Sequence, residues 1–105
     1  MTAFVDTNVI IRHLTGDPPA QAAKATRYLG QVDALLLPDL ILAEIAYVLA
    51  SIYGTSRAAV AETLRAVVGF RPIRVLDKDL LLRAIEGFEI HRIDFADAYL
   101  VAIAE

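Results

Sequence analysis

The sequence predicts one α/β domain over residues 1–105, built as a three-layer α/β/α sandwich around a short, mostly parallel sheet. Three observations predict it. The length of 105 residues suits a single domain. Short apolar runs alternate with longer segments of helical apolar spacing, as in βα units. Residues that cap or end helices separate these segments. The predicted strands cover residues 3–5, 34–37 and 72–76.

The first half of the chain supplies three predicted helices, over residues 7–14, 20–29 and 39–53. The first helix follows Asp6 directly and ends before Gly16. Prolines suit the first turn of a helix, so Pro18 and Pro19 predict the start of the second one, which Gly30 closes. The dipeptide Pro38-Asp39 opens the third helix, and Gly54 is typical of a helix C-terminus.

The second half supplies three more predicted helices, over residues 57–68, 78–88 and 95–104. Ser56 and Asp77 are expected N-caps, and Gly69 stops the fourth helix. Residues 89–93 are predicted to be a connection, after which Asp94 starts the last helix. That helix reaches Glu105 with no following strand, although an α/β unit normally continues into one. We therefore expect a C-terminal segment to be missing from this chain.

Composition narrows the function classes. Hydrophobic residues make up 57% of the chain, against about 45–50% in typical domains, which indicates a subunit or partner interface. A net charge of −3 and a pI near 5.3 argue against a broad basic nucleic-acid-binding face. They still allow a nuclease whose contacts are local or mediated by metal.

The cellular setting follows from what the sequence lacks. It contains no cysteine, which excludes disulfides and thiolate metal sites and is compatible with a reducing, cytoplasmic location. The N-terminus has no signal-type segment. The most apolar stretch, residues 40–53, is shorter than the roughly 20 residues of a membrane span and contains Glu44. We expect a cytoplasmic protein without a membrane partner.

Three acids stand alone in the three most apolar segments. Asp6 follows the first strand, Glu44 is the only charge within residues 40–50, and Asp97 is the only charge within residues 95–103. Helices that are apolar on every side are expected to be central. If the fold brings these acids together, desolvation and mutual repulsion would raise their pKa values or require a cation. Mg²⁺ or Mn²⁺ suits an all-carboxylate site.

Each of these acids also has a structural explanation. Asp6 could cap the first helix through the amide of Asn8 or Val9. Glu44 could pair with an arginine of another helix. Asp97 follows Asp94 by three residues, which mimics a capping box. One shared site explains all three positions together.

Other candidates carry weaker signals. Thr7 and Asn8 could bond the Asp6 carboxylate or a metal-bound water. Asp94 is expected to be an N-cap. His13 and His91 have no partner at ligand spacing and are expected at the surface. Four arginines could meet a phosphate backbone but are scattered along the sequence: Arg12, Arg71, Arg74 and Arg92.

An ordered set of motifs resembles the PIN-domain ribonucleases, and most closely the toxins of VapBC-type toxin–antitoxin pairs. The set is residues 4–9 (FVDTNV), residues 42–45 (LAEI) and residues 94–98 (DFADA), in this order and spacing. The resemblance spans the chain. It implies a metal-dependent endoribonuclease, using Mg²⁺ or Mn²⁺ and cutting structured RNA. It also implies a homodimer and a small antitoxin whose tail covers the active-site groove.

Carried over by motif, Asp6, Glu44 and Asp97 are the expected catalytic and metal-binding acids. Thr7 or Asn8 would support the first acid. The fourth acid of the family follows the last helix and would lie beyond residue 105 of this sequence.

Two other functions stay open at this level. An aspartate phosphatase of the haloacid dehalogenase type would use Asp6 as nucleophile, but it needs a second acid where Asn8 stands. A catalytically silent α/β interaction module would have its acids neutralised by arginines or by a partner.

Overall fold

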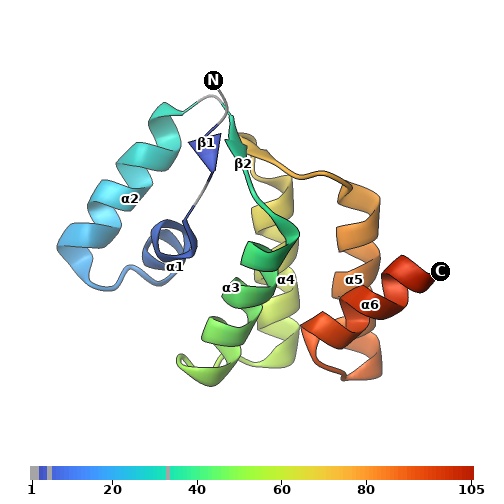
Figure 1. Ribbon diagram of the computed structural model, residues 1–105. Helices are drawn as coiled ribbons and strands as arrows, with labels where there is room; N and C mark the ends of the chain where they lie inside the picture. The colour runs from blue at the N-terminus through green and yellow to red at the C-terminus, as the bar shows by residue number, and fades with distance from the viewer. Residues whose placement is uncertain (1–2, 5, 33) are drawn as a thin grey trace.

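A computed structural model describes residues 3–4, 6–32 and 34–105 (Figure 1). Val5, the last residue of the first predicted strand, lies outside the described residues. Helices make up most of the fold. The elements in chain order are β1 (Ala3–Phe4), α1 (Thr7–Thr15), α2 (Pro19–Gln31), β2 (Leu35–Leu36), α3 (Asp39–Ser51), α4 (Arg57–Gly69), β3 (Ile73–Arg74), α5 (Lys78–His91) and α6 (Phe95–Ala104).

The sheet is parallel and short, which confirms the predicted α/β class. Its strands lie in the order β1-β2-β3, and β2 pairs with both neighbours. The register places Leu35 opposite Ala3 on one side and Ile73 on the other. The middle strand is the most enclosed, so Leu35, its first residue, and Leu37, directly after it, are fully buried. Each strand is shorter than predicted, because two residues in each are paired with a neighbouring strand.

Helices flank this small sheet on two sides (Figure 1). The pair α1 and α2 lies beside β1, while α3, α4, α5 and α6 follow on the other side. The largest side chains of the core come from both groups of helices and from β2, and they are fully buried: Leu29, Leu35, Leu37, Leu42, Ile45, Val60, Leu64, Leu81 and Ile85. None of the helices in the described part of the chain is long and apolar enough to cross a membrane.

The carboxyl edge of the sheet positions the candidate site. Helices α1, α3 and α5 each begin two or three residues after a strand ends. Because parallel strands end at one common edge, Asp6, Asp39 and Asp77 all start their helices there. Asp6 and Asp77 accept hydrogen bonds from the amides of Asn8 and Leu80 and so cap α1 and α5, as predicted for Asp77.

Several helix ends follow the predicted signals. Ser56 Oγ accepts from the amide of Ala59 and caps α4. Gly54 has a φ of +64°, the left-handed backbone that favours glycine after a helix. Gly16 ends α1 in the same conformation, with a φ of +70°.

Two predicted helix ends are wrong. Helix α2 continues through Gly30 to Gln31, because burial of Leu29 holds its last turn against the core. Helix α5 continues through the predicted connection over residues 89–93 as far as His91, because packing against α6 extends it. Arg92 then makes the turn with a φ of 55°, a role that sequence patterns assign to glycine or asparagine.

The prediction that α3 and α6 are enclosed on every side is also wrong. Both helices bury one face through residues such as Leu42 and Ala98. The opposite faces carry exposed large apolar side chains: Leu40, Tyr47, Leu100, Val101 and Ile103. The chain therefore has more apolar surface on these helices than its own fold covers.

Candidate functional site

Asp6 lies at the junction of the first strand and α1, exposed to solvent. Its Oδ1 accepts a hydrogen bond from the backbone amide of Asn8 at 2.9 Å. The capping role predicted as one explanation of Asp6 is therefore confirmed. Asn8 bonds the Asp6 carboxylate through its backbone amide rather than its side chain. A cap of this kind fixes the carboxylate at the edge of the sheet and places its charge at the positive end of the helix dipole.

Glu44 is tied to the same edge by Thr7. The Thr7 hydroxyl donates to Glu44 Oε2 at 2.5 Å, across the contact between α1 and α3. Thr7 itself is 9% exposed, whereas Glu44 is exposed. Since Thr7 follows Asp6 directly, this bond links Glu44 to the residue next to Asp6. The hydroxyl predicted to support Asp6 instead holds Glu44.

An arginine partner for Glu44 is not found. Within residues 3–4, 6–32 and 34–105, the one ion pair is between Arg65 and Glu89, at 2.7 Å on α4 and α5. The structural explanation of Glu44 as half of an ion pair is therefore wrong for the described chain.

Replacing Thr7 by Val is expected to release Glu44 from α1 while keeping the volume of the side chain. We expect RNA cleavage to fall about 10- to 100-fold, the usual effect of removing a partner that orients a metal ligand. The free energy of unfolding should fall by only about 1 kcal/mol. Cleavage rates and urea unfolding curves measure the two effects. Thr63→Val on α4 is the matched control. Cleavage by Thr7→Val within twofold of the wild-type rate would contradict the role of Thr7 in orienting Glu44.

Asp97 lies in the first turn of α6 and is exposed. Asp94 occupies the N-cap position of that helix, but its side chain makes no capping hydrogen bond. The predicted N-cap position of Asp94 is therefore confirmed, but its side chain does not cap the helix. The capping-box explanation of Asp97, which needs that hydrogen bond, is wrong. Helix α6 packs mainly on α5 and also contacts α3, the helix that carries Glu44.

Thr7 links Glu44 to the residue next to Asp6, and Asp97 lies on a different helix, α6. No three acidic or histidine side chains of the described residues form a group that could hold a metal ion. The three acids are exposed, so the expected desolvation by apolar surroundings does not occur. The reason is that the apolar residues beside them on α3 and α6 also face outward. Their catalytic and metal-binding roles remain predictions.

The donor set still suits a hard divalent cation. Asp6 and Glu44 offer carboxylate oxygens at one edge of the sheet, the ligands that Mg²⁺ and Mn²⁺ prefer. Their exposure leaves room for the water molecules that Mg²⁺ usually retains. The chemistry of these side chains therefore fits such an ion, although the described residues form no ready group of three ligands.

A pair that sequence patterns missed lies beside these acids. Tyr99 on α6 donates its hydroxyl to Asp39 Oδ2, at the start of α3, with a distance of 2.5 Å. The other oxygen, Oδ1, is buried and has no hydrogen-bond partner among the described residues. The pair links α6, which carries Asp97, to α3, which carries Glu44. In the sequence Asp39 indicates only a helix start and Tyr99 only an apolar helix.

Asp39 changes the acidity of Tyr99. Its hydrogen bond to the phenol raises the pKa of Tyr99 above the ordinary 10.0, and burial and the negative charges of Asp39 and Asp77 raise it further. The folded state thus holds the phenol proton more tightly than the unfolded state does. The resulting stabilisation is complete below pH 10 and is lost as the pH rises through the folded-state pKa.

Tyr99→Phe is expected to lower the free energy of unfolding by about 1 kcal/mol at pH 7, because Asp39 loses its donor. The difference from wild type should persist to about pH 9 and shrink above pH 10, where the wild-type phenol ionises. Chemical denaturation at a series of pH values measures it, with Tyr28→Phe on the exposed side of α2 as control. If the difference in free energy of unfolding instead grew between pH 10 and 11, the pKa of Tyr99 would not be raised in the folded state.

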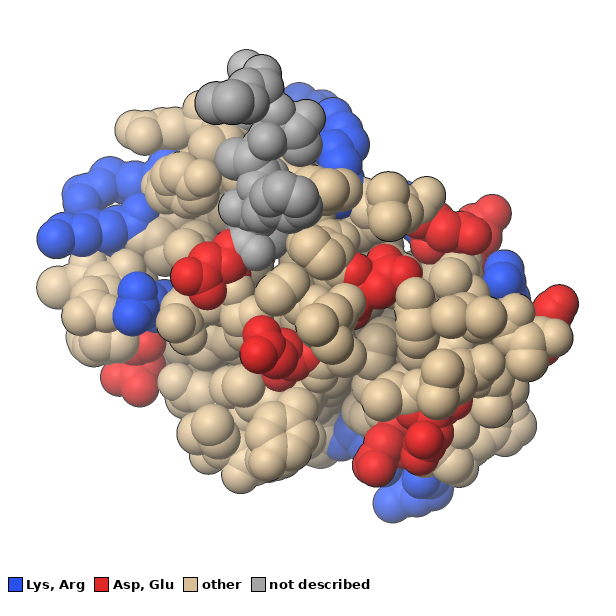
Figure 2. Space-filling view, in the orientation of Figure 1, with Lys and Arg blue, Asp and Glu red and all other residues tan. Residues whose placement is uncertain are grey.

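The remaining predicted candidates are dispersed. His13 bonds the Thr26 hydroxyl at 2.9 Å, and His91 is exposed at the end of α5. The four arginines considered as phosphate contacts lie on separate elements or connections: Arg12, Arg71, Arg74 and Arg92. Figure 2 shows acidic side chains at several separate places across one face of the molecule, with basic ones mainly toward its edges. This face is not a broad basic surface.

The sequence matches one family of known proteins. The family model described as "PIN domain" matches residues 3–105. Comparisons with curated proteins and with solved structures gave no match. Proteins of the matched family are typically nucleases and are generally metal-dependent.

Proposed function

Because this chain belongs to the PIN-domain family, we propose that it is a metal-dependent endoribonuclease that hydrolyses phosphodiester bonds in RNA. One observation carries the proposal most directly. The hydrogen bond from Thr7 to Glu44 ties an exposed carboxylate of α3 to the residue that follows Asp6. This bond supports a shared site for two acids from distant parts of the sequence, since Asp6 lies at the carboxyl edge of a parallel sheet, where α/β proteins place their ligand sites.

Asp6 and Glu44 are the residues that would hold Mg²⁺ or Mn²⁺, with Asp97 as the third acid. When bound, such an ion supplies a polarised phosphate oxygen and a water molecule of lowered pKa. The chain itself orients the carboxylates: the amide of Asn8 fixes Asp6, and the hydroxyl of Thr7 fixes Glu44. The acid side chains also repel a phosphate backbone, so a bound cation should tighten RNA binding near them.

We further propose that the chain is the toxin of a VapBC-type pair, acting in the cytoplasm as a homodimer and neutralised by a small antitoxin. The exposed apolar side chains of α3 and α6 support a protein partner, because Leu40 is 76% exposed and Leu100 is 63% exposed. Exposed apolar surface of this kind marks protein interaction sites.

RNA cleavage with and without metal tests the proposed activity. Purified protein is incubated with tRNA or rRNA in Mn²⁺, in Mg²⁺ and in EDTA, and the products are resolved on denaturing gels. We expect discrete cleavage products that depend on the metal and do not form in EDTA. Equal cleavage in EDTA, or intact RNA in both metals at micromolar protein, would reject a metal-dependent ribonuclease.

The second candidate, a silent interaction module, is favoured by one observation. The described residues contain no ready group of three metal ligands, while two helices carry exposed apolar side chains. A module of this kind should bind its protein partner through α3 and α6 and leave RNA intact in Mn²⁺. The cleavage assay separates the two functions.

A further inference from the structure

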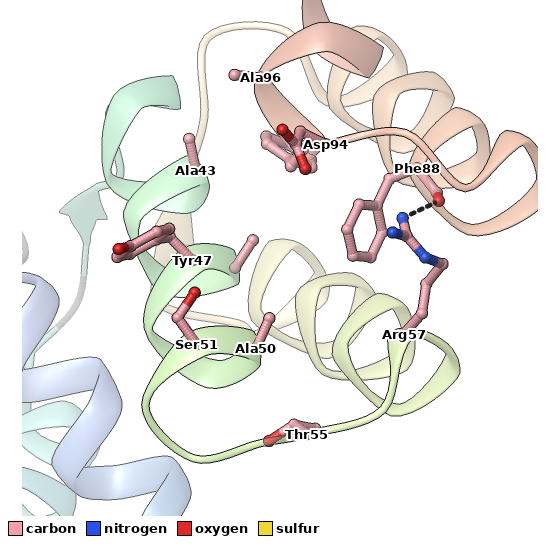
Figure 3. Close-up of a pocket in the computed structure, with 11 residues that line it drawn as sticks. Ala43, Tyr47, Ala50, Ser51, Thr55, Arg57, Phe88, Asp94 and Ala96 are labelled. Carbon is pink, nitrogen blue, oxygen red and sulfur yellow. Dashed lines mark hydrogen bonds between the residues drawn. The ribbon is translucent and has the colours of Figure 1, made fainter.

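A cavity lies between α3 and the start of α6 (Figure 3). Its volume is about 460 Å³, within the range of about 300–1,000 Å³ that is usual for small-ligand sites. Ala43 lines it and precedes Glu44, and Ala96 lines it and precedes Asp97. The same two helices therefore carry both the acids and the walls of the cavity. A strand held at the acids would pass its next nucleotide along these walls.

The floor and rim of the cavity suit a flat ring. Three alanines of α3, Ala43, Ala46 and Ala50, form one wall with small side chains. Tyr47 stands on the same helix and is 67% exposed, so its ring is available at the rim. Phe88 faces the cavity from the opposite side (Figure 3). Exposed aromatic side chains such as Tyr47 stack on the bases of single-stranded RNA, whereas Phe88 is 6% exposed and its ring lies under the Arg57 guanidinium.

Two charged groups of opposite sign line the same cavity and do not pair with each other. The Asp94 carboxylate lies at one end and does not cap its own helix. Arg57 lies at the other side, where its Nη1 donates to the carbonyl oxygens of Phe88 and Ile93, each at 2.8 Å. Its guanidinium also lies over the Phe88 ring, 4.5 Å from the centroid. Arg57 is thus held rigidly, and none of the described carboxylates pairs with it.

A second cavity continues the first. It has a volume of about 320 Å³, shares Ala43 and Ala96 with the first, and extends along α3 and α6 to Asp39 and Tyr99. The two together form an elongated groove, which favours a polymer over an isolated small molecule. An apolar protein segment would fill the groove but would leave the Asp94 carboxylate without a partner, which is unfavourable once water is excluded.

We propose that the cavity between α3, Arg57 and Asp94 binds a guanine base of the RNA strand next to the bond that is cut. Guanine is the base that offers two adjacent N–H donors, N1–H and N2–H, to one carboxylate, and Asp94 can accept both. Tyr47 stacks on the base, and Arg57 faces the phosphate of the same nucleotide. The inference rests on the proposed ribonuclease function, since it assigns the base preference of that site.

Binding in EDTA tests the site independently of cleavage. Fluorescently labelled hexauridylate and the same oligomer with one central guanosine are titrated with the protein, and free guanosine monophosphate is a competitor. We expect tighter binding of the oligomer with guanosine. Tyr47→Ala should weaken that binding roughly tenfold. Asp94→Asn should remove the preference for guanosine. Tyr28→Ala and Asp79→Asn, at exposed positions outside the cavity, should behave as wild type.

Several outcomes would overturn the inference. Equal binding of the two oligomers by wild type would do so, as would unchanged guanosine preference in folded Asp94→Asn. If Asp94→Asn does not fold, binding of the guanosine oligomer by Tyr47→Ala tests the inference alone, because Tyr47 is exposed. Unchanged binding by this variant would then overturn it. Loss of self-association in Tyr47→Ala, with RNA binding unchanged, would assign the cavity to a second copy of the chain. Stronger binding of guanosine monophosphate than of the oligomer would identify a free-nucleotide site instead.

Failure of the proposed function gives a different pattern. A protein that binds the guanosine oligomer selectively but leaves RNA intact in Mn²⁺ retains the base site and lacks the nuclease activity. A protein that cleaves RNA in Mn²⁺ without any base preference retains the activity and lacks the base site.

Discussion

Asp97→Asn and Asp6→Asn are each expected to reduce metal-dependent RNA cleavage by a factor of about 10²–10³, the usual effect of removing one group that stabilises a transition state. Asparagine keeps the shape of each side chain and removes its charge. It is also a good N-cap, so Asp6→Asn should retain the bond to the amide of Asn8 and the stability of α1.

The Asp97 variant is the sharper of the two, because Asp6 also caps α1, so its replacement tests two roles at once. Asp79→Asn is its matched control, since Asp79 is also an exposed acid in the first turn of a helix. Cleavage rates in Mn²⁺ and melting temperatures are measured for all variants. Cleavage by Asp97→Asn at the wild-type rate would remove Asp97 from the active site. Equal losses in Asp97→Asn and Asp79→Asn would indicate a general effect of charge.

Leu42→Ala is expected to be the most destabilising single substitution considered for α3. Leu42 is fully buried, and removal of its side chain should cost about 3 kcal/mol of the 5–15 kcal/mol that typically stabilises a domain. The melting temperature should fall by about 10–20 °C. Thermal unfolding followed by circular dichroism measures it.

Leu40→Ala is the control on the same helix, because Leu40 is 76% exposed. Its effect should stay within about 0.5 kcal/mol in the monomer. Similar losses for both leucines at low protein concentration would contradict the burial of one face of α3 and the exposure of the other. A loss for Leu40→Ala that appears only at high protein concentration would instead show that a second copy covers this face.

Local signals predicted the elements well. Apolar alternation and cap residues placed all three strands and six helices in the right order, and Ser56 and Asp77 cap the helices that they were expected to cap. The errors in the predicted helix ends arise where packing against another element, rather than the local sequence, determines where a helix ends. Arg92 rather than a glycine ends the turn after α5, because contact with α6 extends that helix beyond its local stop signal.

The candidate site was harder to predict, because its geometry depends on contacts between distant residues. The sequence indicates which acids stand in apolar segments, and Thr7, the residue after Asp6, does bond Glu44. It does not indicate that the apolar faces of α3 and α6 would be exposed, which removes the expected desolvation of the acids. The bond between Tyr99 and Asp39 joins residues 60 positions apart, and no local pattern marks it.

A titration with Mn²⁺, followed by thermal unfolding, tests most directly whether Asp6, Glu44 and Asp97 serve one cation. The wild-type melting temperature should rise with Mn²⁺, since a ligand at 100 times its Kd adds about 2.7 kcal/mol to stability. Asp6→Asn, Glu44→Gln and Asp97→Asn should each abolish most of this rise, while Asp79→Asn keeps it. A wild-type protein that does not respond to Mn²⁺, or acid variants that respond as wild type does, would contradict a shared cation site.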